Sequence, residues 1–167
     1  MFSLRQLIAK GQAVYTFLTS TGDTIIMPLY RALSARGVKF AFFHKITDLV
    51  PSADGSTIEG VSVEVQATVT GGPLAYQPIT VMPDGQRVWL NRPDWDQLGE
   101  GLQLRLRSPD LESWWTGWQS VEQKVLRKGV DFDALVCAMP LGTLPYVAPK
   151  LIAQKAPWKA MVDNMDT

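Results

Sequence analysis

The clearest hydrophobic pattern in the chain is the strict alternation of apolar and polar positions over residues 57–69. The apolar positions are Val61, Val63, Val65, Ala67 and Val69, and Ser62, Glu64, Gln66 and Thr68 lie between them. A period of two places all the apolar side chains on one face of a strand. One buried face and one wet face are typical of an antiparallel sheet.

A helical pattern precedes this strand, within residues 22–50. Its apolar positions share one helical face and are Ile25, Ile26, Leu29 and Leu33. Asp23 is expected to be the N-cap, and Gly37 stands where a helix end needs a positive φ. Pro28 removes a backbone donor, so we expect the helix to begin near Met27 or to bend there.

After Gly37 the period changes from that of a helix to that of a strand. Val38, Phe40, Phe42 and Ile46 fall on one face of a strand over residues 38–46, opposite Lys39 and Lys45. A helix that leads directly into an apolar strand is typical of a layered α/β arrangement.

The second half of the chain predicts a long helix followed by a buried strand. Ser108 and Pro109 are good helix-opening residues and Gly129 is a stop. An apolar stripe between them consists of Leu111, Trp114, Trp115, Trp118, Val121 and Val125. Residues 134–139 are continuously apolar, as in a parallel strand covered on both faces, and we expect them to pair with residues 38–46.

The remaining segments give weaker signals. A helix is expected over residues 2–18, and shorter strands over residues 75–82 and 87–90, the first weakened by Pro78. Residues 93–104 fit either a short helix or a loop. Together these elements predict an α+β chain with an antiparallel β-meander, covered by helices.

Composition narrows the classes of protein. The chain has 167 residues, a formal net charge of zero and 46% apolar residues, which fits one globular domain over residues 1–167 and gives no basic excess for nucleic acid. The single cysteine, Cys137, cannot form an internal disulfide and fits a reducing, cytoplasmic location. No apolar stretch approaches the roughly 20 residues that a membrane span needs.

Two stretches resemble the superfamily of flavin-dependent amine oxidases and phytoene desaturases. One is the Gly22-Asp23 pair with the following helix and the sequence Arg36-Gly37-Val38-Lys39-Phe40. The other is DFDALVCAMP, which includes Asp133, Ala138 and Pro140. The tryptophan-rich segment and Trp158 are most similar to the hydroxysqualene dehydroxylase-like bacterial branch. The resemblance implies a substrate-side sheet plus cofactor-side helix–strand elements at residues 22–50 and 130–145, which would supply one or two strands of an FAD/NAD(P)-binding-type sheet.

The resemblance also implies which residues would lie along the cofactor. The backbone of Ile46 would lie beside the adenine of FAD, and Ala138, Met139 and Pro140 would line the same cofactor. The sequence has no G-x-G-x-x-G turn to hold a pyrophosphate. We therefore expect FAD in the complete enzyme and none bound to this chain alone.

Single residues give few candidates for chemistry. His44 is expected to be half-buried and satisfied by backbone, and Cys137 to be a small core residue rather than a nucleophile. Asp94, Asp96 and Glu100 form either an acidic rim or a solvated loop.

The six tryptophans are the unusual feature of the sequence. The expected structural role is core packing for Trp114, Trp115 and Trp118. The expected functional role is an aromatic wall of a substrate pocket, for which Trp89 and Trp95 are the better candidates because they flank a loop.

Two function classes remain open. The first is a fragment or orphan domain of an FAD-dependent amine oxidase-like oxidoreductase that contributes the substrate-binding region. Its partner would be the missing FAD-binding half or subunit. The second is a stand-alone, non-catalytic binding module for an apolar ligand or a partner protein. Apolar faces built to contact an absent domain also predict a homodimer.

Overall fold

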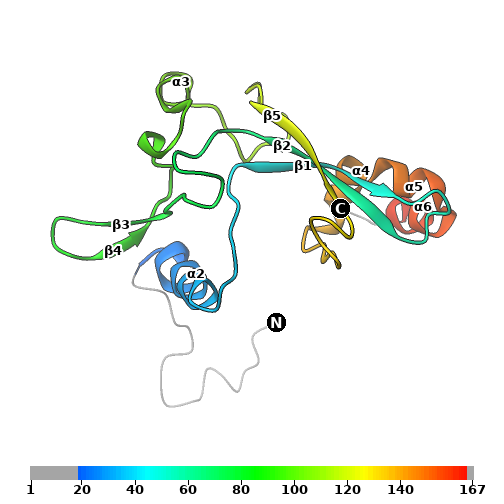
Figure 1. Cartoon of the computed structure of the whole chain (residues 1–167), viewed down its shortest axis with the longest axis horizontal. Helices are drawn as coiled ribbons and strands as arrows, with labels where there is room; N and C mark the ends of the chain where they lie inside the picture. The colour runs from blue at the N-terminus through cyan, green and yellow to red at the C-terminus, as the bar shows by residue number, and fades with distance from the viewer. Residues whose placement is uncertain (1–18, 165–167) are drawn as a thin grey trace, which may run out of the picture. The chain divides into compact units, whose positions relative to one another are not determined.

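The structure is a computed structural model that describes residues 19–164 (Figure 1). The expected helix over residues 2–18 lies outside this range. The chain divides into two compact units. In the described range, the first unit contains residues 19–40 and 77–94, and the second contains residues 41–76 and 95–164. Two units of one chain can still share a single folding transition, so the single domain stays a prediction.

The helix of the first unit ends as the sequence predicts. A π-helical turn η1 (Gly22–Ile26) continues as helix α2 (Met27–Ser34), with Pro28 in its first turn. At the other end Gly37 has a φ of 87° and the Val38 N–H donates to the Leu33 carbonyl at 3.1 Å. These are the conformation and the bond of a glycine-terminated helix end.

Asp23 is not the N-cap, which corrects that prediction. Thr21 occupies the cap position without a cap bond from its own side chain, and the Ser20 hydroxyl accepts from the Asp23 N–H at 3.1 Å. The Asp23 carboxylate accepts hydrogen bonds from the backbone N–H of Trp89 at 2.7 Å and from the Ser20 hydroxyl at 2.9 Å. Trp89 lies in strand β4 (Arg87–Trp89), which pairs antiparallel with β3 (Ile79–Val81). Asp23 thus joins the helical segment to the hairpin, and the two weaker strands are confirmed in shortened form.

The second unit is organised around an antiparallel three-stranded sheet. Its strands are β1 (His44–Pro51), β2 (Ile58–Val65) and β5 (Glu122–Arg127), in the order β1-β2-β5. Both pairs are antiparallel, which confirms the prediction from residues 57–69 and the α+β class. The valines at 61, 63 and 65 are all buried, whereas Ser62 and Glu64 are half-buried.

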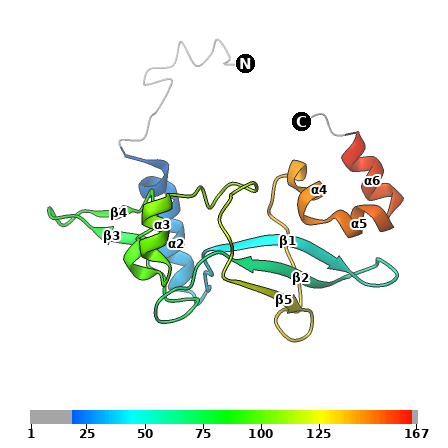
Figure 2. The same ribbon diagram turned by 90° about the horizontal axis from the view of Figure 1, so that it is seen from above.

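Short helices cover the valine face of this sheet. Helices α4 (Leu144–Val147), α5 (Pro149–Gln154) and α6 (Ala156–Asp163) lie on one side of the strands in Figure 2. Val61, Val63 and Leu49 share a buried cluster with Leu144 and Leu151. The alternation in β2 therefore matches a sheet with helices on its apolar face.

A second buried cluster surrounds helix α3 (Gly101–Arg107). Leu104 is fully buried there, together with Ala67, Val69, Tyr76 and Leu98. A 3-10 turn η2 (Trp95–Gln97) precedes the helix. The ambiguous stretch over residues 93–104 is thus a short turn followed by the start of a helix.

The strand expected over residues 38–46 begins only at His44. Phe43 has a φ of 59°, a conformation that interrupts a regular strand at a non-glycine residue. Its ring and that of Phe42 pack on Tyr76, with centroids 4.9 and 5.1 Å away. Packing in the second cluster therefore determines the conformation before β1.

The long tryptophan helix predicted from Ser108 to Gly129 is wrong. Ser108 has a φ of 43° and ends helix α3 instead of starting a helix. Asp110 accepts bonds from the N–H groups of Glu112 and Ser113, which forms a turn. Residues 122–127 then pair with β2, because the hydrogen bonds of a ladder along this strand outweigh local helix preference.

The strand predicted over residues 134–139 is also wrong, and so is its pairing with residues 38–46. The partner of β1 is β2, and residues 134–139 lie outside any strand. Val136 is 87% exposed and Cys137 is exposed, so Cys137 is not the core residue that the sequence predicted. An apolar run shows only that a segment tends to be covered, not what covers it.

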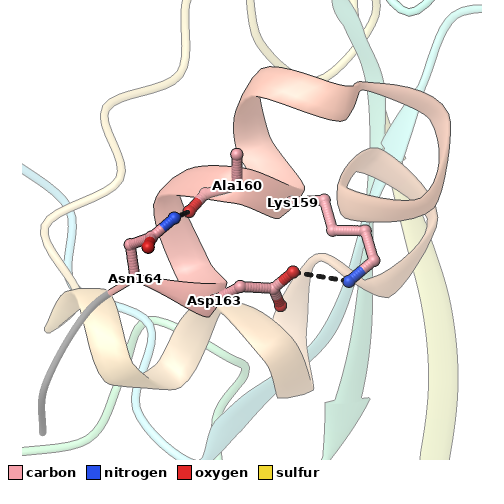
Figure 3. Close-up of polar contacts among 4 residues, drawn as sticks. All are labelled: Lys159, Ala160, Asp163 and Asn164. Carbon is pink, nitrogen blue, oxygen red and sulfur yellow. Dashed lines mark hydrogen bonds and ion pairs between the residues drawn. The ribbon is translucent and has the colours of Figure 1, made fainter.

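A 3-10 turn η3 (Leu141–Thr143) leads into the C-terminal helices, of which α6 is closed by local polar contacts. The Lys159 ammonium is 2.6 Å from the Asp163 carboxylate, and the Asn164 amide donates to the Ala160 carbonyl at 2.6 Å. Figure 3 shows both contacts as dashed lines. Exposed ion pairs of this kind contribute little, about 0.3–0.5 kcal/mol.

Candidate functional site

The residues expected along FAD lie in two different environments. Ile46 belongs to β1, pairs with Val63 and packs half-buried against the sheet core. Ala138 is exposed and Met139 half-buried in the segment before η3, where the Pro140 carbonyl accepts from the Thr143 N–H at 3.0 Å. Side-chain positions do not test contacts that would be made mainly by backbone, so these assignments stay predictions.

A groove borders this segment. It has a volume of about 280 Å³ and is mainly apolar. The lining includes Leu49, Phe132, Leu135, Cys137 and Trp158. Since residues 134–139 leave their side chains exposed beside it, they do not form a cradle for a dinucleotide on their own. The described residues thus do not fit FAD unless another part of an enzyme completes the site.

The two tryptophans expected in a substrate wall belong to different units. Trp89 lies in the first, where its ring is 5.5 Å from that of Tyr30 in an edge-on contact. Trp95 lies in the second and packs half-buried against the cluster around Leu104. Each ring is held by its own unit, and a shared wall stays a prediction.

His44 has the environment that the sequence predicts. It is half-buried, its Nδ1 is 2.5 Å from the Phe42 carbonyl, and its Nε2 is 2.9 Å from the Lys124 ammonium. An ammonium group only donates, so Nε2 accepts and the Nδ1–H donates to the carbonyl. Both ring nitrogens thus have a partner, and the ring lies next to a pocket of about 180 Å³ that Glu122 also lines.

The acidic residues around η2 have structural partners. Asp96 forms an exposed ion pair with Arg105 at 2.7 Å. Glu100 accepts bonds from the N–H and hydroxyl of Thr68, at 2.7 and 3.0 Å. Over residues 19–164 no cluster of three histidine, cysteine or acidic side chains could hold a metal ion.

Asp48 is a feature that the sequence analysis missed. It is a buried carboxylate that pairs through Oδ2 with the Lys150 ammonium at 2.5 Å, while Oδ1 has no hydrogen-bond partner in the described part of the chain. The pair joins β1 to α5. Its position inside the helix-covered layer indicates a structural role, and alternation alone could not reveal it because a bulge interrupts the register after Ile46.

Sequence analysis also missed a pocket at the loop between α3 and β5. It has a volume of about 400 Å³, and its lining includes Trp115, Trp118, Arg107 and Asp110. Trp115 is 76% exposed, which corrects its expected place in a core. The loop occupies residues that the sequence predicts as a helix.

Comparison with known proteins adds no relative. No protein-family model, no curated protein and no solved structure matches the chain. None of the helices between residues 19 and 164 is long and apolar enough to cross a membrane. Function must therefore be argued from the residues themselves.

Proposed function

We propose that this chain is the substrate-side part of an FAD-dependent amine oxidase-like oxidoreductase, whose cofactor-binding half is supplied by another segment or subunit. The observation that carries the proposal is the state of residues 134–139. They form a continuous apolar run that lies largely exposed at the surface and belongs to no strand.

The apolar side chains of this run are largely uncovered, and its backbone groups lack hydrogen-bond partners among the described residues. Leu135 is 40% and Val136 87% exposed. No hydrogen bond joins the backbone of residues 134–139 to any other described residue. A segment with free N–H and carbonyl groups and apolar side chains is suited to join the edge of a second sheet. The cofactor-binding half of a flavin enzyme would offer such an edge.

The apolar groove supports the same assignment. Leu135 and Cys137 line it together with Trp158, so a strand added beside the run would also cover this groove. The resemblance of DFDALVCAMP to the strand that re-enters the cofactor domain points to the same partner.

In the complete enzyme FAD would accept the hydride, and this chain would position substrate and exclude water. Trp89 and Trp95 stay the proposed substrate contacts, and Ile46, Ala138, Met139 and Pro140 the proposed backbone contacts to the cofactor. The described residues supply no glycine turn for the pyrophosphate, so the cofactor would depend on the other half.

A stand-alone binding module is the second candidate. The exposed indole of Trp115 beside a 400 Å³ pocket favours it. The two candidates differ in what must accompany the chain in its source.

Purification of the native protein from its source, with an antibody raised against this chain, separates the candidates. We expect the chain to be recovered with one FAD per copy and with a polypeptide segment that carries a G-x-G-x-x-G turn. Mass spectrometry and the flavin absorption spectrum measure both. Recovery of an 18.5 kDa chain alone, without flavin, would reject the oxidoreductase and favour the binding module.

A further inference from the structure

The loop between α3 and β5 has no regular structure but is tied to Gln66 by two hydrogen bonds. Gln66 is buried, and its side-chain amide donates to the Leu111 carbonyl at 2.7 Å. The Gln66 carbonyl accepts from the indole N–H of Trp118 at 2.7 Å. Asp110 caps the turn that follows Leu111. The tryptophans of this loop are therefore presented by a fixed backbone.

Two of the three tryptophans in the loop are used by the fold. Trp118 packs against the cluster around Leu104. Trp114 lies under the Lys45 ammonium, 4.5 Å from the ring centroid, and its carbonyl accepts from the same group. The Trp115 ring meets the Tyr146 ring edge-on, with centroids 5.8 Å apart, and the residue is 76% exposed. Packing of the fold does not account for this exposed indole.

The pocket beside Trp115 combines an aromatic surface with polar groups of both signs. Arg107 and Asp110 line it, with the hydroxyl-bearing residues Ser113 and Thr116. Within residues 19–164, the Arg107 guanidinium makes no hydrogen bond or ion pair, so all its donors are free for a ligand. Gly117 also lines the pocket and has no side chain, and the space beside its Cα is open.

These groups select for the chemistry of the ligand. A guanidinium and a carboxylate in one pocket leave it without net charge, so long-range attraction favours neither an anion nor a cation. A pure hydrocarbon would leave both polar groups without partners. A ligand with hydroxyl groups can donate to Asp110 and accept from Arg107, while an apolar ring face lies against the indole of Trp115.

We propose that the pocket formed by Arg107, Asp110, Trp115 and Trp118 binds a neutral sugar ring, as in a pyranose unit of an oligosaccharide. The C–H face of the ring stacks on Trp115, and its equatorial hydroxyl groups reach the polar rim. This site does not depend on the proposed flavin chemistry, since none of the residues that line it is a proposed contact of the cofactor or of the oxidoreductase substrate.

The test is a titration of the purified full chain with cellotetraose, a neutral glucose tetramer. It is followed by two-dimensional NMR of the six indole N–H groups, assigned by substitution. We expect a saturable shift of the Trp115 indole signal. Trp115→Ala, followed through the indole signal of Trp118 in the same pocket, should weaken binding at least about tenfold, as for an aromatic hot spot. Trp158→Ala is the matched control, because Trp158 is also exposed but lines a different groove, and it should leave the affinity unchanged.

Charge provides the second arm of the test. Binding of a neutral ligand should not change when salt is raised to about 0.5 M, where surface charges are strongly screened. Phenylalanine, which carries both charges and an aromatic ring, should bind more weakly than the sugar. No saturable shift of Trp115 at about 10 mM cellotetraose, or tighter binding of phenylalanine, would overturn the assignment. So would equal losses in Trp115→Ala and Trp158→Ala.

Discussion

Replacement of Leu104 by alanine tests the packing of the second cluster. Leu104 has no exposed surface, and it lies among Ala67, Val69, Tyr76 and Leu98. The substitution removes three carbon atoms, which corresponds to about 2.4 kcal/mol of transfer free energy at roughly 0.8 kcal/mol per methylene. The cavity that remains adds to this loss, so we expect a decrease of about 3–4 kcal/mol in the free energy of unfolding.

Helix α3 offers a matched control for this prediction. Leu106 lies two residues after Leu104 on the same helix and is 76% exposed. Leu106→Ala should therefore change the free energy of unfolding by less than about 0.5 kcal/mol. Urea titrations followed by circular dichroism measure both variants. For a chain of this size the loss in Leu104→Ala corresponds to a decrease of roughly 6–16 °C in the melting temperature. Equal losses in the two variants would refute the placement of α3.

Three further predictions concern other parts of the chain. Gly101→Ala should destabilise the chain strongly, because a Cβ there would clash with the backbone carbonyl of Trp95. Gly117→Ala is the control, since a Cβ at Gly117 would meet open space. Coinciding melting curves of the two variants would contradict this prediction. Hydrogen bonds from Ser52 and Ser56 hold the pKa of Asp54 well below its ordinary value of 3.8, so its contribution to stability is present above that pH and is lost as the pH falls below it. Asp54→Asn should therefore lose less stability than the wild type between neutral pH and pH values below 3.8, and parallel losses in pH-dependent melts would show that the turn is not formed. The isolated chain should form a homodimer without retained flavin absorbance. Because Val136 is 87% exposed, Val136→Lys should convert this dimer to a monomer, as measured by light scattering. A monomeric wild type or a yellow preparation would contradict the prediction.

The sequence predicts the central sheet well because burial repeats along β2. Val61, Val63 and Val65 alternate with polar residues, and this pattern depends only on the two faces of the strand. The helix end at Gly37 is equally local, since a left-handed φ favours glycine. These features need no knowledge of distant segments.

The errors arise where distant contacts decide the structure. The apolar positions from Leu111 to Val125 fit a helical stripe, but the side chain of Gln66 and the outer edge of β2 hold this segment as a loop and a strand. Apolar spacing cannot show that a buried glutamine will pair with a backbone carbonyl 45 residues away. The pocket at Trp115 follows from this loop, so it could not be predicted either.

Amide hydrogen exchange over residues 134–139 tests the central claim most directly. In the isolated chain these amides have no hydrogen-bond partner among the described residues, so we expect fast exchange in the monomeric Val136→Lys variant. In the native assembly purified from its source they should be strongly protected, because the run joins a sheet of the FAD-binding half. Fast exchange in both states would contradict the claim that this run is completed by a cofactor-binding half.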